Sequence, residues 1–182
     1  MPFDNDFWKK RYQDTWDISS QREKMISSLI STNTGCKLIN VGLGAESTEF
    51  ISGSADSNGY TKGDADYSVE GTNIFVEITG PLVTSVTEQA ALWFRPDKIR
   101  NAIRNYGKHD TWLLHHLPKT GLVRVVHITP RFISACKNND FKVVEPFIRG
   151  TKERYVEISS NSSFIEPFDN LIAEINKRNN IG

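Results

Sequence analysis

The fold prediction starts from residues 63–80, GDADYSVEGTNIFVEITG. Residues 66–69 and 73–79 have the composition of strands, and the turn residues Glu70-Gly71-Thr72 between them favour an antiparallel pair joined by a tight turn. The second strand alternates, with three aliphatic side chains on one face and three other side chains on the opposite face (Ile74, Val76 and Ile78; Phe75, Glu77 and Thr79). We therefore expect Val76 and Ile78 to be buried and this strand to be central in its sheet.

Two carboxylates lie on these strands. Asp66 begins the first strand and Glu77 lies in the second, and the tight turn brings the two onto neighbouring positions. Carboxylate oxygens are the ligands that a hard divalent cation prefers. The pair therefore predicts a site for Mg2+ or Mn2+, and such an ion can polarise a phosphoryl oxygen and activate water.

The elements around this strand pair indicate the fold class. Ser20 and Glu23 form a capping-box pattern that predicts the start of a helix, which ends near Gly35. Strands bunch together along the chain and do not alternate strictly with helices. The sequence thus predicts an α/β (α+β) fold, a central mixed sheet flanked by helices. The other expected elements are strands 37–43, 111–117, 122–128, 141–144 and 153–158, and helices around 8–16, 87–94, 96–106, 129–136 and from Ser163 onward.

Length and composition set outer bounds. The chain has 182 residues with 22 Lys+Arg and 22 Asp+Glu, so its formal net charge is zero and a protein that coats nucleic acid by bulk charge is excluded. The length suits one domain, 1–182. Cys36 and Cys136 lie in no zinc-binding pattern and favour free thiols. We find no signal peptide and no membrane span, so we expect a cytoplasmic protein without a membrane partner.

These residues resemble the PD-(D/E)XK nuclease superfamily, which has the restriction-endonuclease-like fold. The resemblance covers roughly residues 20–128 in an αβββαβ order, and we expect the strands and helix of residues 141–178 to pack on this core. Asp66 matches the motif aspartate, with Ala65 in place of the proline, and Glu77 matches the second acid. Thr79 stands where the family has its lysine.

The resemblance implies a metal-dependent endonuclease that hydrolyses phosphodiester bonds in DNA. Mg2+ (or Mn2+) would be held by Asp66 and Glu77, with Glu23 as the helix-borne glutamate that often completes the metal site. The capping-box pattern gives Glu23 a second interpretation, as a helix cap. DNA is favoured over RNA as the nucleic-acid partner, and a homodimer is expected by analogy with enzymes that cut both strands.

The replacement of the motif lysine by Thr79 leaves two interpretations. Either another residue supplies the missing function, or the chain is a catalytically inactive nuclease-fold protein that binds nucleic acid or a protein partner. Lys98, on the helix after Glu77, is the preferred substitute, and Lys62 and Gln89 are alternatives.

Basic side chains concentrate on and around the helix that carries Lys98. A phosphate backbone needs such local clusters, although a solvated helix surface is the simpler interpretation of a charge run. Histidines 115 and 116 are adjacent on a strand and should face opposite sides of the sheet. The nucleic-acid-binding candidates are Arg95, Arg100, Arg104 and Lys108, with a second cluster at Arg149, Lys152 and Arg154.

Overall fold

The computed structural model describes residues 5–41, 65–148 and 150–180, with side chains from residue 18 onward. It contains four helices in this part of the chain: α1 (Asn5–Thr34), α2 (Pro96–Arg104), α3 (Pro130–Lys137) and α4 (Phe168–Asn179). The strands are β1 (Leu38–Asn40), β2 (Tyr67–Val69), β3 (Ile74–Thr79), β4 (Leu92–Phe94), β5 (Asp110–His116), β6 (Val123–His127), β7 (Lys142–Val144), β8 (Phe147–Ile148), β9 (Thr151–Lys152), β10 (Tyr155–Ile158) and β11 (Ile165–Pro167).

The main sheet has six strands in the order β1-β2-β3-β5-β6-β11. The β3–β5 pair is parallel and the other four pairs are antiparallel, so the predicted mixed sheet is confirmed. β3 lies between β2 and β5, and Val76 and Ile78 are buried, as expected. The element order α1, β1, β2, β3, α2, β5 is the predicted αβββαβ order, with β4 inserted before α2.

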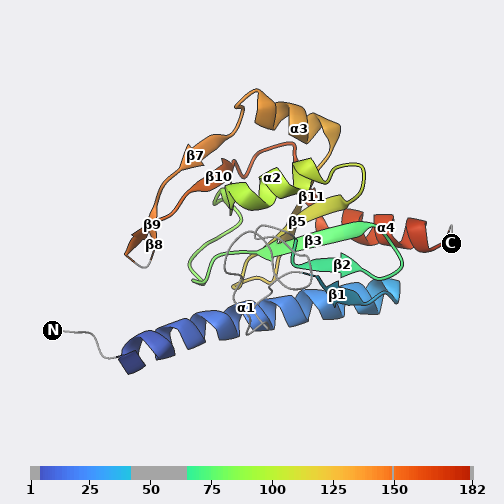
Figure 1. Ribbon diagram of the computed structural model, residues 1–182. Helices are drawn as coiled ribbons and strands as arrows, with labels where there is room; N and C mark the ends of the chain where they lie inside the picture. The colour runs from blue at the N-terminus through green and yellow to red at the C-terminus, as the bar shows by residue number, and fades with distance from the viewer. Residues whose placement is uncertain (1–4, 42–64, 149, 181–182) are drawn as a thin grey trace.

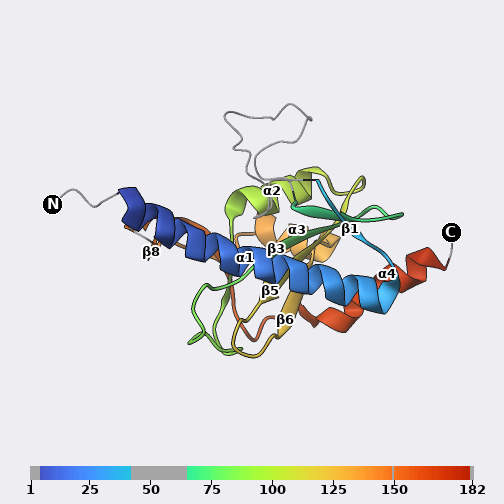
Figure 2. The same cartoon turned by 90° about the horizontal axis from the view of Figure 1, so that it is seen from below.

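Helices cover both faces of this sheet. In Figure 1, α1 runs along one side and α2 and α3 lie on the other, and Figure 2 shows α1 crossing the sheet from end to end. The core on the α1 side includes Ile26, Val76 and Leu171, whereas the core on the α2 side includes Ile99 and Leu113. The alternation along β3 therefore sends Glu77 toward α2 and its aliphatic neighbours toward α1. Among the described residues, no helix is long and apolar enough to cross a membrane.

A second sheet, β4-β10-β7, flanks α2, and β8 and β9 form a two-stranded sheet of their own. The three-stranded sheet shows that the prediction of a helix over 87–94 is wrong, because Leu92–Phe94 is a strand that pairs antiparallel with β10. Leu92 and Phe94 are buried while Trp93 is exposed, which is strand alternation. The partner strand lies some sixty residues further along the chain, so local sequence carries no sign of it.

The predicted helix starts at Ser20 and Ser163 are wrong. α1 is one continuous helix from Asn5 to Thr34, so Ser20 and Glu23 lie in its interior. The interpretation of Glu23 as part of a helix cap is therefore wrong. Ser163 likewise opens no helix, because β11 follows it and α4 begins at Phe168. Other boundaries are confirmed: Gly35 ends α1 with a φ of 73°, and the Thr129 side chain accepts a hydrogen bond from Phe132 N at the start of α3.

Candidate active site

The two predicted carboxylates meet beside the central strand. Asp66 immediately precedes β2, Glu77 lies on β3, and the antiparallel register that pairs Tyr67 with Val76 places the acids side by side. Both residues are buried, with 5% and 7% of their surface exposed. Ile78 N also donates to Asp66 Oδ2 at 3.4 Å, which ties the aspartate to the β3 backbone.

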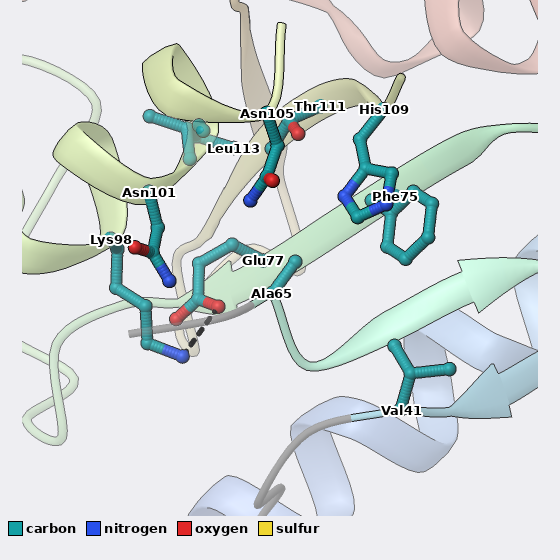
Figure 3. A pocket seen from close by; sticks show the side chains of 11 residues that line it. Val41, Ala65, Phe75, Glu77, Lys98, Asn101, Asn105, His109, Thr111 and Leu113 are labelled. Carbon is teal, nitrogen blue, oxygen red and sulfur yellow. Dashed lines mark ion pairs between the residues drawn. The ribbon is translucent and has the colours of Figure 1, made fainter. Parts of the chain in front are cut away.

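Lys98 reaches both carboxylates from α2. Its Nζ lies 2.9 Å from Glu77 Oε2 and 3.3 Å from Asp66 Oδ1, and 11% of its side chain is exposed. Pro96 starts the helix, as its fixed φ and missing N–H favour. Lys98 therefore lies in the first turn, directly over β3, and Figure 3 shows its ammonium beside Glu77. We call Asp66, Glu77 and Lys98 the acid–lysine cluster.

The acid–lysine cluster has more negative than positive groups, since two carboxylates share one ammonium. Burial and the neighbouring charge of Asp66 raise the pKa of Glu77 to about 8, against the opposing effect of Lys98. Burial acts to lower the pKa of Lys98, but Glu77 and Asp66 outweigh it and the net shift is upward. At neutral pH the ammonium therefore stays charged, and the cluster favours taking up a proton or another cation.

A cavity of about 50 Å³ opens beside this cluster. Its floor is formed by neighbouring residues of the parallel strands β3 and β5, and its roof by one face of α2 (Figure 3). Of the lining residues, the sequence predicted only Glu77 and Lys98 as site residues, although Lys98, Asn101, Ala102 and Asn105 have the i, i+3, i+4, i+7 spacing of a single helix face. The lining residues are Val41, Ala65, Phe75, Glu77, Lys98, Asn101, Ala102, Asn105, His109, Thr111 and Leu113.

Two other predicted site residues lie apart from the ion pairs. Thr79 is the last residue of β3, partly buried and in register with His115 of β5. Glu23 is buried in α1, and its Oε2 accepts a hydrogen bond from the Tyr67 hydroxyl at 3.0 Å. Within the described ranges, no group of three or more His, Cys, Asp or Glu side chains is arranged to hold a metal ion. The metal roles of Glu23, Asp66 and Glu77 stay predictions.

The basic candidates differ in the ion pairs that they form with other described residues. Arg95 forms an ion pair with Asp97 at 2.5 Å, while Arg100, Arg104 and Lys108 are exposed on or just after α2. In the later cluster, one carboxylate, Glu145, binds both Lys152 at 2.8 Å and Arg154 at 3.0 Å. Because Lys152 and Arg154 are already paired with Glu145, the exposed basic side chains on and after α2 are the better candidates for phosphate contact. Gln89 lies exposed in a turn before β4, and Lys62 and Arg149 lie outside the described residues.

A second buried charged group was not anticipated from the sequence. Arg22 of α1 donates from Nε to His116 Nδ1 at 3.0 Å and from Nη1 to the Gly80 carbonyl at 2.9 Å, and it also contacts the Pro81 carbonyl. On the other face of the sheet, Arg124 Nη2 lies 3.3 Å from His115 Nδ1. The predicted opposite orientation of the two histidines is thus confirmed. We call Arg22, His115, His116 and Arg124 the arginine–histidine cluster.

The arginine–histidine cluster holds both ends of the connection between β3 and β4. Arg22 binds carbonyls at its start, and Arg124 Nη1 donates to the Glu88 and Ala90 carbonyls at its end, at 2.9 and 3.0 Å. Gly80 has a φ of 156°, and a Cβ there would lie 2.2 Å from the His116 carbonyl oxygen, so only glycine fits. Burial, reinforced by the charge of Arg124, lowers the pKa of His115 to about 3.

Comparisons with known proteins give little similarity. No family model and no curated protein matches the chain. Among solved structures, a nuclease from a fusselovirus matches with a TM-score of 0.40 and 13% sequence identity. That match covers 67% of this chain and 66% of the viral chain, slightly less than two thirds of its length.

Proposed function

We propose that this protein is a metal-dependent nuclease that hydrolyses phosphodiester bonds in DNA at the acid–lysine cluster. The observation that carries the proposal is the convergence of Lys98 on Asp66 and Glu77, at 3.3 and 2.9 Å. This arrangement supports the PD-(D/E)XK resemblance, with a lysine from α2 in place of the one that Thr79 replaces. The predicted αβββαβ order of the main sheet and its helices agrees with that assignment.

The residues fit a hard divalent ion. Mg2+ is usually held by one or two carboxylates together with waters and substrate phosphates, so Asp66 and Glu77 suffice as protein ligands. Burial and the nearby charge of Asp66 disfavour the ionised form of Glu77, so a cation that replaces its proton would stabilise the carboxylate, which supports a metal site here. When bound, such an ion polarises a phosphoryl oxygen and lowers the pKa of water.

Lys98 acts as a fixed positive charge in this proposal. Its raised pKa keeps the ammonium protonated at neutral pH, so it cannot serve as a general base. Held by two carboxylates and almost fully buried, it is preorganised to stabilise negative charge that develops on an attacked phosphate. Arg95, Arg100, Arg104 and Lys108 lie on or beside the same helix and would contact the flanking phosphates.

The direct test is cleavage by the full chain. Linear, branched and single-stranded DNA and matched RNA should be incubated with Mg2+, with Mn2+ and with a chelator. We expect cleavage of DNA that requires the ion and is lost in Asp66→Asn. Nucleic-acid binding without cleavage under any divalent ion would favour the inactive nuclease-fold protein. The absence of both cleavage and nucleic-acid binding would overturn the proposal.

A further inference from the structure

We propose that the cavity beside the Glu77–Lys98 pair binds the base of one unpaired nucleotide, whose phosphate lies at that pair. The inference rests on the proposed function and names the form of nucleic acid that the site takes. It starts from the two ends of the cavity, which differ in chemistry. One end carries the ion-paired Glu77 and Lys98, and the other carries the aromatic rings of Phe75 and His109 (Figure 3).

The aromatic end is built for stacking. Phe75 of β3 and His109, which precedes β5, are stacked with ring centroids 3.8 Å apart and an interplanar angle of 17°. Both rings line the cavity and are partly buried. A flat stacked pair at the wall of a cavity offers a surface on which a planar base can stack, a contact that contributes about 1–3 kcal/mol per base.

The roof of the cavity supplies hydrogen-bonding groups. Asn101 and Asn105 are one turn apart on and just after α2, and Figure 3 shows both amides directed from the helix toward β3. Thr111 of β5 adds a buried hydroxyl at the floor. Each amide carries a donor and an acceptor, which is what the edge of a nucleobase requires. The remaining lining is apolar, with Ala102 and Leu113 among its residues.

The dimensions suit a single base. A cavity of about 50 Å³ has room for roughly four water molecules, or about 120 Å³ of liquid water. That space is comparable to one nucleobase and too small for a base pair. Phe75 and Glu77 lie two residues apart on the same face of β3, about 6.6 Å along the strand. This spacing is of the order that separates a phosphate from the base of the same nucleotide, so one nucleotide reaches both ends.

The test compares ligands with and without a base. Calorimetry on the full chain should use deoxynucleoside monophosphates and, as the matched probe, deoxyribose 5-phosphate, each with and without Mg2+. We expect at least one monophosphate to bind about 5–150-fold more tightly than the probe. Phe75→Leu keeps the apolar bulk and removes the ring, so it should abolish most of this difference. Tyr106→Leu changes an exposed aromatic residue that does not line the cavity and should leave the difference intact.

Each outcome bears on the proposal separately from the nuclease assignment. Equal affinity for monophosphates and probe, or no binding of either at millimolar concentration, would overturn the base site even if the protein cleaves DNA. Base-dependent binding without any cleavage would support the base site and contradict the nuclease. Should Phe75→Leu fail to fold, Asn105→Ala replaces it, since that side chain lies at the end of α2 and its loss should also weaken monophosphate binding selectively.

Discussion

The acid–lysine cluster includes Glu77 of β3, whereas the arginine–histidine cluster contacts the chain at Gly80, just after β3 ends, and the two buried clusters are balanced in different ways. The arginine–histidine cluster is surplus in positive charge, and main-chain carbonyls at both ends of the β3–β4 connection accept from its arginines. The acid–lysine cluster has two carboxyl groups for one ammonium, and it borders a cavity. A buried charge that donates to main-chain carbonyls stabilises the fold, whereas a buried charge at the wall of a cavity can contact a ligand.

The clusters also respond to pH in opposite directions. Glu77 holds its proton in the folded state up to a pKa of about 8, so the folded state binds the additional proton and its stability falls as the pH rises from 4.5 to about 8. His115 has a folded pKa of about 3 against an ordinary value of 6.5. It stays neutral in the folded state, and stability is lost as the pH falls through 6.5 toward 3.

The largest expected effect is on cleavage by Lys98→Ala. Removing one preorganised electrostatic donor costs ~10²–10³ in rate. Cleavage should fall by that factor while the variant stays folded and still binds Mn2+. Arg100→Ala, which removes an exposed positive charge two residues away, should instead weaken DNA binding and reduce the slope of its salt dependence by about one. Full activity in Lys98→Ala would exclude the role assigned to the lysine.

The next effect concerns stability and the arginine–histidine cluster. Arg22→Met removes the donor to His116 and to two main-chain carbonyls, and leaving buried acceptors unsatisfied costs about 1–3 kcal/mol for each group. We expect the free energy of unfolding, measured with urea, to fall by about 3 kcal/mol. Arg100→Met on the exposed side of α2 is the matched control and should change it by less than about 0.5 kcal/mol. Equal effects in the two variants would show that the cluster does not hold the connection.

A smaller effect should distinguish the two clusters by pH. Glu77→Gln removes the titration of Glu77, so the variant should lack the part of the stability loss that the wild type shows between pH 4.5 and about 8. Above that window it should be more stable than the wild type, because the wild type then carries an ionised and buried Glu77. Chemical denaturation across the pH range measures this difference. Parallel stability curves for the two proteins would mean that Glu77 is ionised in the folded state at neutral pH.

The sequence was most informative where the deciding contacts are local. The turn at Gly71 joins two strands only a few residues apart, so the β2–β3 pair and the convergence of Asp66 with Glu77 followed from spacing. Pro96 marked the start of α2, and the family resemblance suggested Lys98 as the replacement for the missing lysine. Those features need no knowledge of distant parts of the chain.

Prediction failed where a distant partner decides the structure. Leu92–Phe94 is a strand because β10 pairs with it, and β11 occupies the place of an expected helix because β6 pairs with it. Ser20 resembles a cap, but packing of Ile26 and Ile30 against the sheet favours one uninterrupted helix. Likewise, Arg22 gave no signal because its partners, His116 and the Gly80 carbonyl, are far away in sequence.

The central claim is that Asp66 and Glu77 bind a divalent ion, and Mn2+ calorimetry tests it most directly. Since the ion must displace a proton from Glu77, affinity should rise by about tenfold per pH unit up to about pH 8 and then level off. Asp66→Ala combined with Glu77→Ala should abolish binding, whereas Asp97→Ala, an acid on α2 paired with Arg95, should leave it intact. Unchanged Mn2+ binding in the double variant would contradict the account.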